Sequence, residues 1–222
     1  MRHLARAALA VGLVIALGGC GSSSSSGGGS DEASKSADQI FSDLVAAMKQ
    51  VDHVHITGTQ TDDSGTAQLT GDVTQTSARV EVKANGNDTV FIVTGGKAYG
   101  SQNGGPFSEL PADLTVQVSV ATLAKTIECA QSEHGTLAKG EVSTLNGVRV
   151  IALTDDGKAP GASPSTAFIT LDGPARLIET RQTGRTTPGG RADCGHSSTD
   201  TTTAQQSDFD YSGPTPTITP PV

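Results

Sequence analysis

Aromatic rings and basic charge are what this chain has least of. Its 222 residues include no Trp, and Phe and Tyr together make up only 3%. A surface that stacks bases usually carries more rings. Lys and Arg number 15 against 23 Asp and Glu, which gives a formal net charge of −8. Because phosphate binding needs a positive surface, this charge balance argues against a nucleic-acid partner. With so few aromatic residues, the core must be built from Val, Leu, Ile and Ala.

Long hydrophobic runs are also missing, apart from a short one near the N-terminus. Arg2 and Arg6 precede an apolar stretch over residues 7–17, which is too short for a membrane-spanning helix but typical of a secretory signal. The stretch runs into Leu-Gly-Gly-Cys, so Cys20 stands where a bacterial lipobox places the Cys that receives diacylglycerol. We therefore expect a signal peptide over 1–19 and lipid on Cys20; the alternative is an ordinary secretory signal with an incidental Cys.

The expected organisation follows from this N-terminus and from changes in composition. Lipidated Cys and a flexible Ser/Gly linker would occupy 20–35, a single domain 36–213, and a Pro-rich tail 214–222. Each buried methylene contributes roughly 0.8 kcal/mol and one acyl chain binds only marginally, so two chains make a durable anchor. The predicted location is the cell membrane, lipid-anchored on its extracytoplasmic face.

Hydrophobic periodicity predicts one amphipathic helix followed by strands. Ser36 and Gln39 form a capping box, and the apolar face behind it comprises Ile40, Phe41, Leu44, Val45, Met48 and Val51. From Val54 onward the period changes to two, as in half-buried antiparallel strands, although residues 89–93 are apolar on both faces. A second helix is predicted over 114–130.

Two turn signals predict hairpins in the second half of the chain. Asn146-Gly147 joins 141–145 to 148–154, and Asp172-Gly173 joins 166–171 to 175–183. A last strand is predicted over 205–211. The predicted fold class is α+β: a strongly curved antiparallel sheet, or half-open β-barrel, wrapped around one or two helices.

The order of motifs resembles a known family. After the lipobox and linker come a helix, Val-His-Ile-Thr-Gly from Val54, Gly-Gly-Lys-Ala-Tyr from Gly95, and Pro-Phe-Ser-Glu-Leu-Pro from Pro106. The two hairpins and Phe-Asp-Tyr-Ser-Gly-Pro from Phe209 close the series. Together they resemble the LolA/LppX-type lipoproteins of actinobacteria. The resemblance implies a half-open barrel whose apolar cavity holds acyl chains, in proteins that carry lipids across the envelope or sense them.

A concave apolar face suits a chain-like ligand even without the resemblance, provided that the first helix does not fill it. If the helix fills it, the same residues form an ordinary core, and for any one of them core packing is the commoner role. The expected ligand is a lipid or acyl chain, with an envelope protein as the alternative partner. The candidate lining residues are Phe41, Leu44, Val45, Met48, Val54, Ile56, Leu69, Val80, Val82 and Ile92.

The two remaining cysteines stand outside the family pattern. Outside the cytoplasm an even pair usually forms a disulfide, so Cys129 and Cys194 are predicted to be joined. The alternative is a zinc site that adds His134 and His196, although these spacings match no familiar zinc motif.

Catalytic signatures are weak. His53 and His55 share one face of a strand beside Asp52, which suits a weak metal site or, more often, the polar face of an outer strand. There is no nucleophile elbow and no P-loop spacing. We therefore predict no enzymatic activity, no metal and no cofactor. The competing functions are a membrane-tethered lipid carrier or sensor, a protein-interaction module on the same fold, and a small hydrolase or metal-binding protein.

Overall fold

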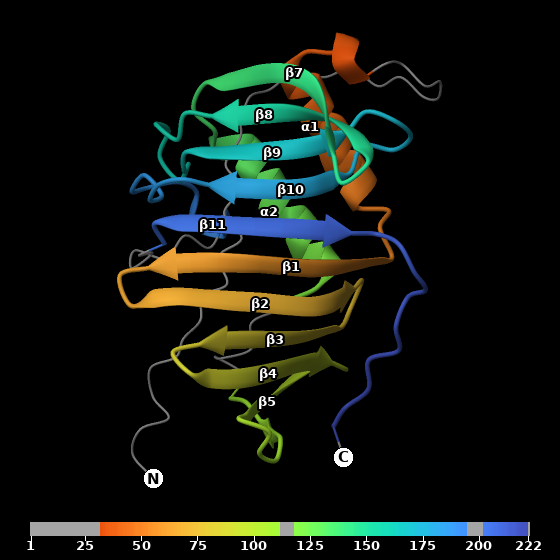
Figure 1. Cartoon of the computed structure of the whole chain (residues 1–222), viewed down its shortest axis with the longest axis vertical. Coiled ribbons are helices and arrows are strands. Elements are labelled where there is room, and N and C mark those ends of the chain that lie inside the picture. Colours follow the sequence, from red (N-terminus) through yellow and green to blue (C-terminus); the bar gives the residue numbers. More distant parts are fainter. Residues whose placement is uncertain (1–31, 112–117, 195–201, 222) are drawn as a thin grey trace.

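One antiparallel sheet with two helices against one face makes up the structure, a computed structural model that describes residues 32–111, 118–194 and 202–221 (Figure 1). The predicted signal peptide and Cys20 lie outside these ranges. The described elements are η1 (Glu32–Ser34), α1 (Ala37–Met48), β1 (His53–Asp62), β2 (Gly65–Thr74), β3 (Ala78–Ala84), β4 (Asn87–Thr94), β5 (Lys97–Gln102), β6 (Ser108–Glu109), α2 (Val120–Glu133), β7 (Leu137–Leu145), β8 (Val148–Asp155), β9 (Ser165–Thr170), β10 (Leu177–Gln182), η3 (Ala192–Cys194) and β11 (Ala204–Asp210).

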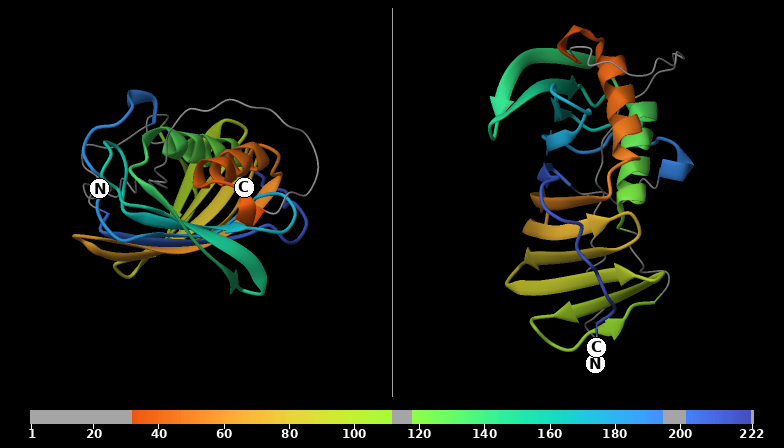
Figure 2. Two further views of the ribbon diagram at one scale, coloured as in Figure 1. Left: turned by 90° about the horizontal axis from the view of Figure 1, so that it is seen from above. Right: turned by 90° about the vertical axis from the view of Figure 1, so that its right-hand side faces the viewer.

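Two runs of neighbouring strands meet in the middle of the sheet. The order of the eleven strands in the described ranges is β6-β5-β4-β3-β2-β1-β11-β10-β9-β8-β7, and the pairs are antiparallel. The first and last strands of the chain, β1 and β11, therefore lie side by side. The edges are β6 and β7, so the sheet is not closed. Both helices lie on its inner face, which confirms the predicted α+β class (Figure 2).

Local signals placed several elements correctly. The Ser36 hydroxyl accepts a hydrogen bond from Gln39 N at 3.2 Å, and the Gln39 side chain accepts one from Ser36 N at 3.0 Å, so the predicted capping box forms. Asn146 and Gly147 have φ values of 53° and 81°, the left-handed conformation that a two-residue hairpin turn requires between β7 and β8. The hairpin predicted at Asn146-Gly147 is confirmed.

The second helix differs from its predicted bounds. The helix α2 begins at Val120, because Ser119 is extended and its hydroxyl accepts a hydrogen bond from Thr122 N at 3.0 Å; residues 114–117 of the predicted helix lie outside the described residues. It continues to Glu133, where the chain becomes extended at His134. The start of the helix was misjudged because apolar residues such as Val118 continue the helical spacing before the Ser119 cap.

Two glycines on the inner face allow the sheet to curve. A Cβ on Gly71 would lie 2.4 Å from the carbonyl oxygen of Arg79 on β3, and one on Gly58 would lie 2.5 Å from the carbonyl oxygen of Gln206 on β11. Real Cβ atoms do not approach backbone so closely. Neighbouring strands therefore come together over these positions only because both side chains are missing, which is how glycine introduces curvature into a sheet.

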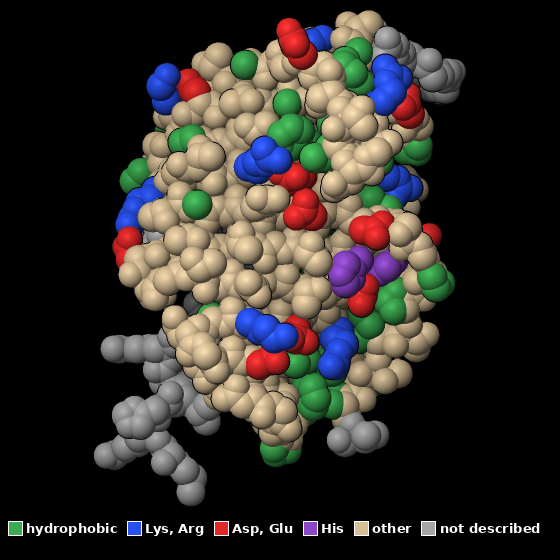
Figure 3. All heavy atoms as spheres, viewed as in Figure 1, with side chains coloured by type: hydrophobic (Ala, Val, Ile, Leu, Met, Phe, Trp, Pro, Cys, Tyr) green, Lys and Arg blue, Asp and Glu red, His purple; other side chains and the backbone are tan. Residues whose placement is uncertain are grey.

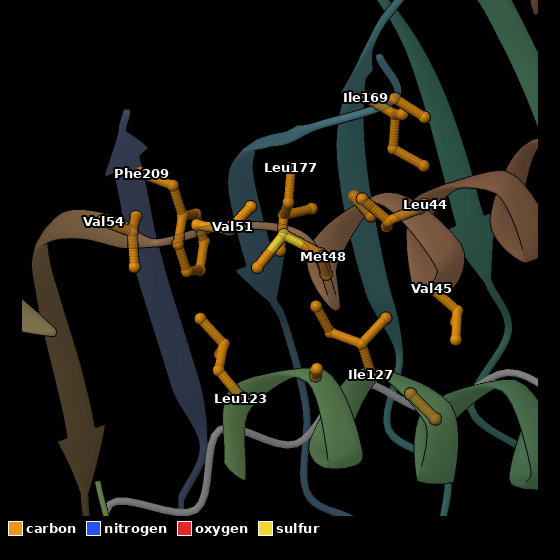
Figure 4. Packing of buried hydrophobic residues seen from close by; sticks show 14 of the residues in the cluster. Leu44, Val45, Met48, Val51, Val54, Leu123, Ile127, Ile169, Leu177 and Phe209 are labelled. Atoms are coloured by element: carbon orange, nitrogen blue, oxygen red, sulfur yellow. The ribbon is translucent and has the colours of Figure 1, made fainter. Parts of the chain in front are cut away.

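The main core lies between the helices and the strands β8–β11. Leu44 and Met48 of α1 and Ile127 of α2 are fully buried and point toward Ile169 and Leu177 of β9 and β10 (Figure 4). Tyr211, directly after β11, donates a hydrogen bond from its hydroxyl to Leu177 O at 2.9 Å. Neither helix in the described ranges combines the length and apolar character needed to cross a bilayer.

Candidate functional site

The residues predicted to line a cavity fall into three groups in the structure. The first group is on α1, where Phe41, Leu44, Val45 and Met48 are at most 7% exposed. All four belong to the core cluster that includes Ile169 (Figure 4). In this half of the molecule the first helix fills the concave face, so these four residues act as core.

The second group lies on the inner face of β1–β3. Val54 is fully buried and packs in the core, and Val80 and Val82 are at most 6% exposed. Ile56 and Leu69 are only half-buried and pack against the edge of the core cluster. The predicted lining is therefore mixed: Val54, Val80 and Val82 are buried, whereas Ile56 and Leu69 on the same face keep contact with solvent.

The third group is Ile92 alone, which the strand register places on the outer face. Ile92 pairs with Arg79 on β3 and with Tyr99 on β5, and directly paired residues point to the same side of a sheet. Its neighbour Phe91 pairs with Val80 and therefore takes the inner face instead. The residues on both sides of β4 are apolar, so alternation alone did not reveal which of them faced inward.

The partly open inner surface is the candidate site. Both helices lie beside β7–β11. Near β1, α1 ends and α2 begins, so β2–β5 extend beyond both helices (Figure 2). On this part of the sheet the inner face remains apolar; residues such as Val73, Val80 and Val82 are buried, but others keep contact with solvent. We call this set the apolar inner face; its half-buried members are Ile56, Ala67, Leu69 and Phe91.

Glycine shapes this surface as well as curving it. Gly71 lies between Ile56 and Val80 in the cross-strand row, and Gly58 lies beside Leu69 in the next row. At these positions the neighbouring strands approach closely, so the face consists of Ile56, Leu69 and Val80 around tightly packed backbone. Such a surface offers non-directional contact and few hydrogen-bonding groups, which suits hydrocarbon and not a polar substrate.

The outer face of the same strands has the opposite chemistry. It contains a trough of about 400 Å³ lined mainly by hydroxyl, amide and charged side chains. Thr57 and Thr59 of β1 and Gln68 of β2 supply the uncharged groups, and Lys83 pairs with Glu81. Figure 3 shows this face as largely uncharged polar surface with scattered ion pairs. A trough of this kind does not suit acyl chains.

The two histidines of β1 converge on one carboxylate. His53 Nε2 lies 3.0 Å and His55 Nδ1 2.9 Å from Asp72 Oδ1 on β2, so their partner is Asp72 and not the adjacent Asp52 (purple in Figure 3). Partial burial raises the pKa of Asp72, but the hydrogen bonds from His55 and His53 outweigh it and hold that pKa below the usual 3.8. Within the described ranges, no cluster of His, Cys, Asp and Glu has the arrangement of a metal site.

Cys129 and Cys194 form a disulfide that ties α2 to η3. Both thiols are therefore used, and the alternative zinc set is not formed; His196 lies outside the described residues. The same corner carries further links, because Arg191 N donates to the carboxylate of Glu133 and Lys125 lies 3.6 Å from Asp193.

One polar cluster was missed by sequence reasoning. Glu179 of β10 is only 2% exposed on the outer face, where it pairs in register with Asp208 of β11 and contacts Arg181. Partial burial and the neighbouring Glu179 carboxyl raise the pKa of Asp208. Only the strand register brings these acids together, since 29 positions separate them in the chain. No local motif could have revealed the pair.

Comparisons with known proteins bear on the fold. No protein-family model and no curated sequence matches this chain. Among solved structures, LprF from Mycobacterium bovis aligns with a TM-score of 0.55 and 18% identity, over 83% of this chain and 96% of that one. The lipoprotein LppX from Mycobacterium tuberculosis aligns with a TM-score of 0.49 and 17% identity, over 79% and 95%.

A more distant match is a LolA superfamily protein from Nitrosomonas europaea, with a TM-score of 0.29 and 11% identity over 80% of this chain and 92% of that one. At these identities the likeness concerns the fold, and LprF carries it. The alignment with LprF covers nearly all of that protein and both halves of this sheet. The chain therefore shares the fold of LprF, an open curved antiparallel sheet with helices on its inner face, which is the architecture that the LolA/LppX resemblance implied.

Proposed function

We propose that this protein is a membrane-anchored extracytoplasmic lipoprotein that binds lipid through its acyl chains and carries or presents it. The observation that carries the proposal is the apolar inner face, where Ile56, Leu69 and Phe91 pack against the edge of the core and remain half-buried. When a hydrocarbon chain covers apolar side chains that contact solvent, the free energy falls by about 25 cal/mol per Å² of apolar surface removed from water.

The fold supports the same proposal. The other half of the concave face is filled by α1 and α2, so the helices and β8–β11 form a rigid support that needs no ligand to be stable. An acyl chain along β1–β4 would extend this core rather than build it. Binding and release of a ligand would then leave the rest of the fold unchanged.

The proposed anchor comes from the sequence. The lipobox at Cys20 and the Ser/Gly linker would hold the domain beside the outer surface of the cell membrane. The disulfide between Cys129 and Cys194 fits an oxidising compartment outside the cytoplasm. Palmitate-type chains on the N-terminal Cys would thus serve as the anchor, while a separate lipid occupies the inner face.

Shielding acyl chains from water requires burial and not bond-making, so we propose a binding protein rather than an enzyme. The acidic pair Glu179–Asp208 lies on the outer face, on the side of the sheet away from the apolar inner face. A protein-interaction module on the same fold would be the alternative, with a polypeptide in place of lipid on that face.

The direct test is native mass spectrometry of an exported, unanchored Cys20→Ser protein purified without detergent, followed by solvent extraction of bound lipid. We expect a protein–lipid complex and recovery of acyl-chain lipids. In a Leu69→Gln variant the retained lipid should fall about tenfold, which corresponds to about 1.4 kcal/mol of lost burial. Thr59→Gln is the matched control, because it adds the same side chain on the neighbouring strand's outer face and should retain lipid fully.

The outcomes separate the alternatives. Ligand-free protein recovered repeatedly, with no uptake of added phospholipid, would overturn the proposal. Equal loss of lipid in both variants would place the binding elsewhere on the molecule. A co-purifying polypeptide that Leu69→Gln releases, with no lipid present, would instead establish the interaction module.

A further inference from the structure

The chain after β11 leaves the sheet and joins no helix or strand. It runs along the side of the sheet from β11 toward β4 (dark blue in Figure 1). Thr94 at the end of β4 donates a hydrogen bond from its hydroxyl to Ile218 O at 3.1 Å, which holds the segment against the body. We call residues 214–221 the tail.

Exposure alternates along the tail. The side chains of Thr215, Thr217 and Thr219 are exposed, whereas Pro216 and Ile218 between them are half-buried against the protein. No hydrogen bond joins these three threonine hydroxyls to any described residue. The tail therefore presents three free hydroxyls in a row on its solvent side.

The tail backbone is extended and largely unpaired. Proline at 214, 216, 220 and 221 removes backbone donors and holds the preceding residues in extended conformations, which excludes helix. The described backbone contacts of the tail reduce to the one bond that Ile218 O accepts from Thr94. An extended segment with free backbone groups is what a modifying enzyme can bind along its own cleft.

The exposed threonines of β1 do not meet this condition. Thr57 and Thr59 are also exposed, but they lie in β1, which pairs with β2 on one side and β11 on the other. An enzyme could reach their hydroxyls only from above the paired strands, without access to their backbone. In the tail, unlike in β1, accessible hydroxyl groups and an accessible backbone occur together.

We propose that Thr215, Thr217 and Thr219 are O-glycosylation sites. Threonines interspersed with prolines form the composition of O-glycosylated stalks. Outside the cytoplasm the sugar donor would be a polyprenyl phosphate sugar. The threonine oxygen forms a bond to the anomeric carbon, the bond from that carbon to the phosphate oxygen breaks, and the hydroxyl proton leaves with the polyprenyl phosphate. The inference rests on the extracytoplasmic location proposed above.

Sugars on the tail would not interfere with the proposed lipid site. Thr94 points to the outer side of β4, since Val93 pairs with Ala78 on the inner face, so the tail is held on the side away from the apolar inner face. The modification would enlarge the hydrated surface at this side of the domain and leave the inner face accessible.

The test is the intact mass of the exported, unanchored Cys20→Ser protein from an actinobacterial host, with fragmentation that locates any sugar. We expect a ladder of hexose increments assigned to 215–219, and its loss in the T215V/T217V/T219V variant. The matched control T57V/T59V keeps the ladder. The same chain from a bacterium that lacks a threonine glycosyltransferase outside the cytoplasm should show the bare mass.

Two results would overturn the inference. One is a bare mass for the Cys20→Ser protein from the actinobacterial host with its three tail threonines intact, when recovery outside the cytoplasm with the Cys129–Cys194 disulfide formed shows that it was exported. The other is a ladder that survives in the T215V/T217V/T219V variant, which would assign the sugars to other hydroxyls. Lipid recovered from the same preparation reports on the proposed function separately, so the two can fail independently.

Discussion

The two halves of the sheet use the same kind of residue for different ends. Along β8–β10 the inner face meets α1 and α2, and Ile151, Ile169 and Leu177 are at most 1% exposed. Along β1–β4 the inner face is equally apolar, but Ile56, Leu69 and Phe91 keep contact with solvent. The alternation of hydrophobic residues thus predicts which side chains point to the inner face, but not whether those side chains are fully buried. Whether such a face is core or binding surface depends on what lies over it.

The largest expected effect comes from the covered half, where the disulfide ties α2 to η3. Replacing Cys129 and Cys194 together with Ala removes a cross-link between residues 65 positions apart, which in the loop-entropy description costs about 4 kcal/mol of unfolding free energy. Guanidinium denaturation of the two proteins measures the difference. Reductant should destabilise the wild-type protein similarly and leave the variant unchanged; a wild-type protein indifferent to reductant would contradict the assignment.

A matched pair of leucines compares the halves directly. Leu44→Ala removes a fully buried side chain from the core and should lower the unfolding free energy by about 3 kcal/mol. Leu69→Ala is the same change on the apolar inner face, where the half-buried side chain should cost only about 1 kcal/mol. Denaturation in the absence of lipid measures both. Equal losses would mean that β2 is as fully packed as α1, and the distinction between the halves would fail.

Lipid should change the ranking of these two variants. If acyl chains cover the apolar inner face, added lipid raises the melting temperature of the wild-type protein and of Leu44→Ala by similar amounts, because a ligand stabilises the state that binds it. Leu69→Ala should gain less, because it has lost part of the contact. Thermal unfolding with and without phospholipid checks this. A full gain in Leu69→Ala would place the ligand away from β2.

Signals that act over a few residues were the ones that sequence alone could interpret. The Ser36–Gln39 box and the Asn146-Gly147 turn each depend on groups within four positions, and both form as predicted. Ile92 was placed on the wrong face because both sides of β4 are apolar, so its orientation follows from register with β3 and β5. The sequence also could not predict that the helices cover only part of the inner face. This depends on where α1 ends and α2 begins relative to strands distant in sequence.

The smallest effect is expected on the outer face, at Asp72. Its pKa is lowered in the folded protein, so the ionised carboxylate adds stability above pH 3.8, and this contribution is lost as the pH falls through the lowered value. The carboxylate is 38% exposed and solvent screens its contacts with His53 and His55, so the contribution is below about 1 kcal/mol. Asp72→Asn should therefore lower stability slightly at pH 6 and flatten its decline below pH 4, as measured by urea denaturation across that range.

A matched change separates this local effect from general acid unfolding. Asp52→Asn alters the carboxylate next to His53 in sequence. Both imidazoles contact Asp72 instead, so this substitution should leave the decline of stability in acid as in the wild-type protein. Because Asp72 lies on the opposite side of the sheet from Leu69, neither substitution should alter lipid retention. A change in lipid retention with Asp72→Asn would mean that the two faces of the thin sheet are coupled, and the contrast between a polar outer and an apolar inner surface would then no longer describe two independent sites.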